Sequence, residues 1–139
     1  MQQGAKAISN GKDKEYSVSE CLTNLGIDFV KQHRFTSIYG NKRAQMGFYI
    51  PSLDIAIVVK SQEVSGSCDH KLPYAMLNLG AHPAKRKVLV MAGDHYTTRR
   101  PTVYHWAKKF AATLEKKLDV LYIDELEDYL EQTEARQAA

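Results

Sequence analysis

The chain has 139 residues, 44% hydrophobic and 25% charged, which is typical of a single globular domain with a substantial core. No apolar run approaches the length of a membrane span, and residues 1–14 lack the apolar stretch of a signal peptide, so we expect a cytoplasmic protein with no membrane partner. The two cysteines, Cys21 and Cys68, have the spacing of neither a zinc site nor a disulfide framework.

The formal net charge is +3, and it is unevenly distributed. Short basic clusters recur through the body of the chain, whereas six acids lie from Asp124 to Glu134. A basic body with an acidic tail suits an anionic partner on one side, although solvated faces explain the same pattern equally well. Phosphate contacts fix position on DNA rather than read its sequence. The candidates for such contacts are Lys42, Arg43, Lys71, Arg99 and Arg100.

The first half of the chain is predicted to form a flexible leader, a helix and three strands, at residues 1–13, 14–25, 34–39, 43–50 and 55–60. Apolar residues recur at helical spacing before Gly26, which is a natural helix stop. Gly40 and Asn41 mark a turn after the first strand. The next two apolar runs flank the turn at residues 51–54 and therefore predict a β-hairpin.

The second half is predicted to alternate helices and strands: a helix at 71–79, a buried strand at 87–93, a polar loop at 94–100, an amphipathic helix at 101–118, a strand at 119–123, an acidic helix through Leu130, and a polar tail at 133–139. Pro73 is expected in the first turn of its helix, and Trp106 is expected in the core. An antiparallel meander followed by this alternation predicts an α/β fold, with a mixed central sheet flanked by helices, in one domain over residues 14–132.

The hairpin carries polar side chains at the end of its second strand. Lys60 and Gln62 project from one face, which Val58 shares, because side chains repeat every two residues along a strand. Together with the preceding Phe48-Tyr49-Ile50-Pro51, this pattern resembles the PD-(D/E)XK nuclease superfamily. The similarity covers most of the chain and implies a restriction-endonuclease-like αβββαβ core. The segment at 62–74 looks like the corresponding part of bacterial and phage members.

The resemblance implies that Lys60, Gln62 and Glu20 stand at the active-site positions of the family. It also implies an Asp and a Glu where this chain has Gly47 and Val58. Magnesium requires oxygen ligands, and neither Gly nor Val has a side-chain oxygen. We therefore expect no metal or other cofactor and no hydrolysis, because an attacking water would lack its activator.

Acids elsewhere in the chain could replace the missing ligands. The candidates are Asp54, Glu63, Asp69 with His70, and Asp94 with His95. Asp54 is expected to serve the hairpin turn, at the far end of the strand from Lys60. The others are explained more simply by the opposite face of a strand, by a helix cap for Asp69 and by an ordinary loop. Tyr96, Tyr104 and His105 near the basic pair at 99–100 suit either a nucleic-acid surface or the packing of a helix N-terminus.

Three functional hypotheses follow. The first is a catalytically inactive nuclease-like protein that binds DNA or assembles with partner proteins. The alternative is an active magnesium-dependent DNA endonuclease, of homing or restriction type, whose acids were mutated or replaced. The third is a purely structural subunit of a phage particle or of another complex. A homo-oligomer or a larger assembly is compatible with each of them.

Overall fold

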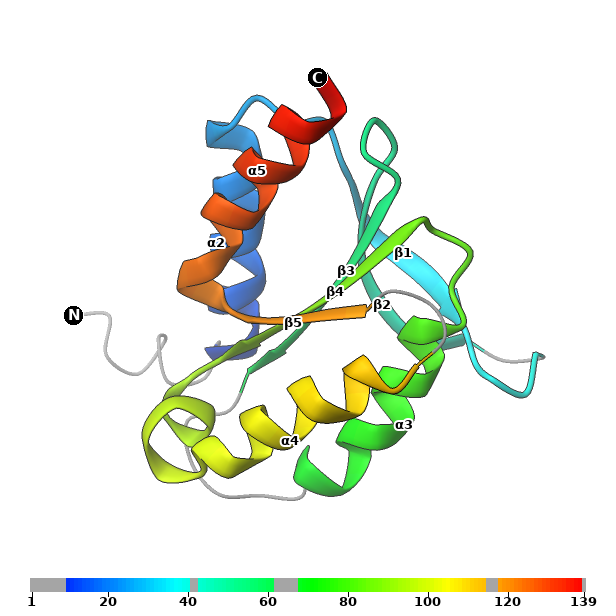
Figure 1. Cartoon of the computed structure of the whole chain (residues 1–139), viewed down its shortest axis with the longest axis vertical. Coiled ribbons are helices and arrows are strands. Elements are labelled where there is room, and N and C mark those ends of the chain that lie inside the picture. Colours follow the sequence, from blue (N-terminus) through cyan, green and yellow to red (C-terminus); the bar gives the residue numbers. More distant parts are fainter. Residues whose placement is uncertain (1–9, 41–42, 62–67, 115–117, 139) are drawn as a thin grey trace.

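The computed structural model describes residues 10–40, 43–61, 68–114 and 118–138 (Figure 1). Its elements are α2 (Asn10–Asn24), β1 (Val30–Thr36), β2 (Arg43–Ile50), β3 (Ile55–Ser61), α3 (Cys68–Gly80), β4 (Arg86–Ala92), the π-helix η1 (His95–Arg99), α4 (Pro101–Ala112), β5 (Leu118–Tyr122), the 3₁₀ turn η2 (Ile123–Glu125) and α5 (Leu126–Ala138). Figure 1 shows three layers, with α2 and α5 on one side of the sheet and α3 and α4 on the other. The predicted α/β class is confirmed.

The five strands form one mixed sheet in the order β1-β2-β3-β4-β5. The first three strands are antiparallel neighbours, and β3, β4 and β5 run parallel to one another. Ser61 pairs with Ala92, so β3 and β4 end at the same edge of the sheet. This edge is where parallel strands usually present functional groups.

Each helix layer closes its own apolar core against the sheet. On β3, Ile57 packs toward α2 and α5, whereas Ala56 and Val58 pack toward α3 and α4. The alternation follows from the two-residue repeat of a strand. Because helices cover both faces, β3 and β4 read as nearly unbroken apolar runs.

Both ends of the described chain are more helical than the sequence predicts. Helix α2 begins at Asn10, inside the predicted leader, whose first nine residues lie outside the described part. Helix α5 continues to Ala138 through the predicted polar tail. Thr133 is only 3% exposed, and the Gln137 side-chain amide donates to the Ser52 carbonyl at 2.9 Å. Tertiary contacts therefore extend this helix, although its sequence is polar.

Several other elements differ from prediction, among them α4, which was expected at 101–118 and ends at Ala112. Strand β1 lies earlier in the chain, at Val30–Thr36 rather than 34–39. Helix α3 starts at Cys68, so Pro73 lies inside it rather than in its first turn. The segment predicted as a polar loop instead forms η1, with His95 and Tyr96 buried. Gly93, at φ 98°, reverses the chain there, and its carbonyl accepts the Tyr96 N–H at 3.2 Å.

Cys21 is a free thiol in α2, and burial followed by the charges of Glu127 and Glu131 raises its pKa. A raised thiol pKa disfavours the reactive thiolate. The Cys68 side chain lies outside the described part. Among the described helices, none has the length and apolar character needed to cross a bilayer.

Candidate functional site

The end of the β2–β3 hairpin brings together three of the positions singled out in the sequence. Tyr49 contacts the core on the α3/α4 side, and Gly47, two residues earlier in β2, lies on the same face of the sheet because side chains repeat every two residues. Val58 packs in that core, and Lys60 continues its face of β3. Phe48 pairs with Ile57, so Gly47 and Val58 are the next residues beyond this pair on their two strands. Gly47, Val58 and Lys60 therefore lie on the α3/α4 face of the hairpin, and their correspondence to a family active site stays a prediction.

Apolar packing occupies the acid position on β3. Val58 is 3% exposed and belongs to a cluster with Leu72 and Met76 of α3, both fully buried. On the neighbouring strand, Val58 pairs with Leu89, which is also buried. A carboxylate here would lose its water with no compensating partner.

Magnesium does not fit the residues that stand at this position. Gly47 has no side chain, Val58 ends in methyl groups, and Lys60 would add a positive charge next to the ion. Within the described ranges, no three His, Cys, Asp or Glu side chains come together as a metal site would require. This hairpin therefore lacks the oxygen ligands that metal-dependent hydrolysis uses.

Glu20 does not join Lys60 in the structure. It lies on α2, which covers the opposite face of the sheet, between Val18 and Leu22, both of which are fully buried. A residue two positions from each of these points away from the core, and Glu20 is exposed. Its active-site role stays a prediction. Gln62, the remaining family position, lies outside the described residues.

Asp54 fastens the hairpin turn, as predicted. Its carboxylate accepts the Tyr49 hydroxyl at 2.7 Å and the Lys85 backbone N–H at 3.1 Å. The hydrogen bond from the phenol to this carboxylate is the main reason that the pKa of Tyr49 is raised. Asp54 also adopts φ 54°, a conformation that Asp tolerates better than most residues. The side chain therefore joins the turn to the loop before β4 and is engaged away from Lys60.

The other candidate acids occupy different positions. Glu63 lies outside the described residues. Asp69 falls within the first turn of α3, and its side chain and that of His70 lie outside the described part, so the capping role of Asp69 stays a prediction. Asp94 follows β4 at the edge where β3 also ends, and its side chain is exposed. His95 is 1% exposed and meets the Tyr96 ring edge-on.

Three of the five basic candidates lie on one helix layer. Lys71, Arg99 and Arg100 are exposed on α3, at the end of η1 and at the start of α4, respectively. Arg43 opens β2, with its side chain outside the described part, and Lys42 lies outside it altogether. Lys108 and Lys109 are also exposed on α4 and belong to this surface, although they were not among the predicted contacts. Their position on a helix that follows two arginines was a usable signal in the sequence.

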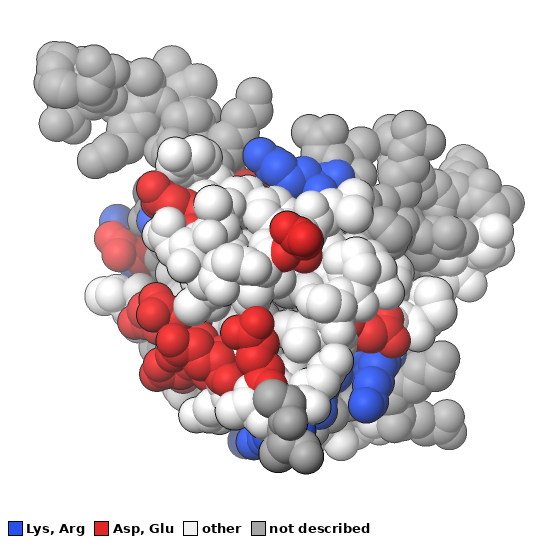
Figure 2. Space-filling model, turned by 90° about the horizontal axis from the view of Figure 1, so that it is seen from above, with Lys and Arg blue, Asp and Glu red and all other residues white. Residues whose placement is uncertain are grey.

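The two helix layers carry opposite charge. Helix α3, η1, Arg100 and α4 contain five cations and one acid, namely Lys71, Arg99, Arg100, Lys108 and Lys109 against Asp69. Helices α2 and α5 with η2 contain nine acids and three cations, namely Asp13, Glu15, Glu20, Asp124, Glu125, Glu127, Asp128, Glu131 and Glu134 against Lys12, Lys14 and Arg136. Figure 2 shows acidic side chains grouped together on the face seen from above, to which α5 contributes. The basic layer covers the face of Gly47, Val58 and Lys60.

Tyr96 and Tyr104 pack inside this layer. Tyr96 is fully buried, and Tyr104 stacks on Tyr122 with ring centroids 3.7 Å apart. The Tyr104 hydroxyl donates to Glu125 at 3.1 Å, and burial is the main reason that its pKa is raised. Both tyrosine rings are therefore buried in this layer rather than displayed on its surface, and Tyr96 does not lie in the solvated loop that was expected. The prediction for Trp106 is wrong, because this residue was expected in the core and is 42% exposed.

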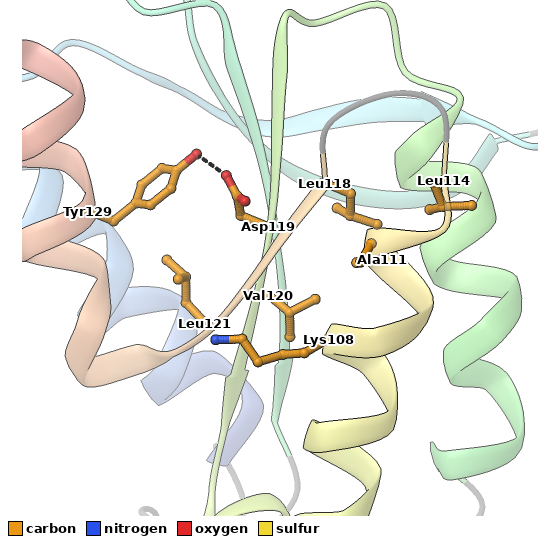
Figure 3. A pocket seen from close by; sticks show the side chains of 9 residues that line it. Lys108, Ala111, Leu114, Leu118, Asp119, Val120, Leu121 and Tyr129 are labelled. Carbon is orange, nitrogen blue, oxygen red and sulfur yellow. Dashed lines mark hydrogen bonds between the residues drawn. The ribbon is translucent and has the colours of Figure 1, made fainter. Parts of the chain in front are cut away.

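A pocket of about 410 Å³ lies beside β5, away from the hairpin (Figure 3). Residues from α4, β5 and α5 line it, and Asp119 supplies the carboxylate of that lining. Tyr129 donates to Asp119 at 2.6 Å, as the dashed line in Figure 3 marks. Burial, followed by this hydrogen bond, raises the pKa of Tyr129. The acid in this pocket thus has a structural partner.

An αβββαβ order around a mixed five-stranded sheet defines the restriction-endonuclease-like class of α/β proteins. A family model described as a PD-(D/E)XK nuclease superfamily domain matches residues 4–134. The chain therefore belongs to the PD-(D/E)XK nuclease superfamily. No curated protein and no solved structure gives a significant match to it.

Proposed function

We propose that this protein is a catalytically inactive member of the superfamily that binds DNA through its α3/α4 face. One observation carries the proposal: the basic helix layer covers the same face of the sheet as Gly47, Val58 and Lys60. A surface with clustered cations attracts the phosphate backbone. The acidic layer on the other face repels it, so DNA approaches from one side only. An intracellular location accords with such a partner.

The loss of catalysis follows from the packing around Val58. Its side chain is buried in the core that α3 helps to form, and Gly47 on the same face of the sheet supplies no side-chain oxygen. Lys60 is partly exposed at the end of β3, where its ammonium group is suited to contact a phosphate without a metal. Binding therefore requires no magnesium or other cofactor in this proposal.

Fluorescence anisotropy with a labelled DNA duplex tests the binding. We expect affinity that persists in the presence of EDTA and falls steeply as salt rises, because each phosphate contact releases a counterion. The absence of affinity at low salt would overturn DNA binding. It would direct attention to partner proteins or to a purely structural role in an assembly.

A plasmid cleavage assay with magnesium or manganese tests the inactivity. The natural chain is compared with the Gly47→Asp/Val58→Glu variant, which restores both acids of the family. We expect no cleavage by the natural chain. If the natural chain cleaves DNA in a metal-dependent way, the inactive assignment is wrong and another acid supplies the ligand.

A further inference from the structure

We infer that the groove between α3 and α4 binds an unpaired base of single-stranded nucleic acid, with the base stacked on Trp106. This inference rests on the proposed function and specifies the form of nucleic acid that the basic layer prefers. Trp106 was expected in the core and is instead 42% exposed.

The groove is a pocket of about 410 Å³. Its walls come from two helices: Leu72 and Pro73 from α3, and Thr102, Val103 and Trp106 from α4. The lining side chains are apolar apart from the Thr102 hydroxyl and the Trp106 indole N–H. A volume of this size lies within the range of small-ligand sites, and its mainly apolar lining suits the flat face of a base.

Trp106 is held in place at this groove. Its indole stacks on the ring of Phe110, with centroids 5.0 Å apart and planes at 9°. The buried stripe of α4 follows Tyr104, Ala107 and Ala111, so Trp106 lies at the flank of that stripe. One side of the indole is therefore supported by the protein, while 42% of the residue remains exposed. A rigid, partly exposed aromatic ring is suited to stacking on a base.

Exposed cations are close in sequence to the residues that line the groove. Lys71 directly precedes Leu72 on α3, Arg99 and Arg100 lie just before α4, and Lys109 follows Trp106 by three residues, one helical turn. No acid occurs between residues 95 and 112. This charge complements a phosphate backbone on either side of a stacked base. An uncharged apolar peptide would not make use of these cations.

The geometry favours an unpaired base over a duplex. In a duplex each base face is already stacked on its neighbours, so an indole reaches a face only where a strand is single or splayed. Duplex DNA can still contact the surrounding cations through its phosphates. The groove should therefore distinguish the two forms by stacking, while the cations serve both.

Trp106 reports its own environment, because it is the only tryptophan in the chain. The natural protein is titrated with an oligothymidylate of about 12 nucleotides, within the usual span of single-strand sites, and with a duplex of equal length. We expect quenching of tryptophan fluorescence by the single strand and little change with the duplex. Binding of the single strand without any change in fluorescence would overturn the inference and leave the proposed function intact.

Two variants separate stacking from simple apolar contact. Trp106→Leu should weaken binding of the labelled oligothymidylate by about tenfold, because base stacking on an aromatic ring is lost. Trp106→Phe, the matched control, retains a ring and should stay within about threefold of the natural protein. Neither change should alter duplex affinity, and thermal unfolding by circular dichroism verifies that both variants fold.

The possible failures are distinguishable. An equal loss of single-strand and duplex affinity in Trp106→Leu would contradict a stacking role. A concentration-dependent shift of Trp106 fluorescence without nucleic acid, accompanied by dimer formation in sedimentation, would assign the groove to a second copy. Loss of all nucleic-acid affinity in the natural protein would overturn the proposed function as well.

Discussion

The two helix layers use the same packing and opposite electrostatics. Each buries an apolar stripe against the sheet, around Leu22 and Leu130 on one side and around Met76 and Ala107 on the other. Their outer surfaces differ, because α5 with η2 is rich in acids whereas η1 and α4 carry cations without any acid. Burial decides where a helix lies, and its exposed charges decide which partners that face accepts.

Each helix layer is also joined to the sheet region by a similar hydrogen bond. One helix in each layer has a tyrosine that donates to a carboxylate on β5 or η2: Tyr104 of α4 donates to Glu125, and Tyr129 of α5 donates to Asp119. Glu125 accepts a second bond from the Tyr122 N–H at 2.8 Å. Matched substitutions on the two sides therefore test what is common to the layers and what separates them.

The largest expected effect comes from placing a carboxylate in either core. Val58→Glu and the adjacent Ile57→Glu, on opposite faces of β3, should each lower the free energy of unfolding by about 3–5 kcal/mol, because a buried charge lacks a partner. Urea unfolding measures both losses.

Magnesium should stabilise a variant whose two acids lie on one face of the sheet and not a variant whose acids lie on opposite faces. We expect millimolar magnesium to raise the melting temperature of Gly47→Asp/Val58→Glu, in which two carboxylates meet on one face. The control variant Gly47→Asp/Ile57→Glu has the same charge, with its acids on opposite faces, and should not respond. Equal stabilisation of both variants would mean that the hairpin geometry is not selective.

Removing charge from the basic layer should have the next largest effect. Arg99→Ala/Arg100→Ala should weaken duplex binding by about tenfold and reduce the salt slope by about two, one for each phosphate that an arginine no longer neutralises. Glu127→Ala/Glu131→Ala, the matched change on the acidic layer, should leave binding unchanged or slightly stronger. Anisotropy at several salt concentrations measures both, and a loss of equal size in the acidic pair would refute the assignment of faces.

The hydrogen bonds from Tyr104 and Tyr129 should contribute unequally to the free energy of unfolding. Tyr129→Phe should lower the free energy of unfolding by about 1–3 kcal/mol, because the Asp119 carboxylate loses its phenolic donor. Tyr104→Phe should cost about 1 kcal/mol or less, since Glu125 keeps the Tyr122 N–H. Urea unfolding of the two variants decides between this order and its reverse.

The smallest effect at neutral pH concerns the tyrosine hydroxyls. Burial raises the pKa of Tyr104, Tyr122 and Tyr129 above the ordinary value of about 10. Above pH of about 10 the unfolded chain releases phenolic protons that the folded protein still holds. The contribution of these tyrosines to the free energy of unfolding is therefore fully present below pH of about 10 and is lost as the pH rises through the folded pKa values. Unfolding at increasing pH, with tyrosinate absorbance recorded in parallel, should show this decline, and Tyr129→Phe should make it shallower. Stability that rises above pH of about 10 would contradict it.

Several parts of the fold were predictable because their signals are local. The hairpin follows from two apolar runs around one turn, whereas the family position of Val58 was implied by the resemblance alone. The element order was also correct, since helical and strand periodicities are read within short windows. The π-helical turn at His95 was not predictable, because its buried residues depend on partners distant in the sequence.

The sequence by itself determined the superfamily, the order of the elements and the absence of side-chain oxygen at Gly47 and Val58, because these depend only on residue identity and short-range spacing. Only the tertiary structure decided which charge covers which face of the sheet and that Trp106 lies in an open groove. It also joined Asp54 to Lys85, 31 residues further along the chain. The physical reason is that burial depends on all the surfaces that meet at a position, and those surfaces come from segments far apart in the chain.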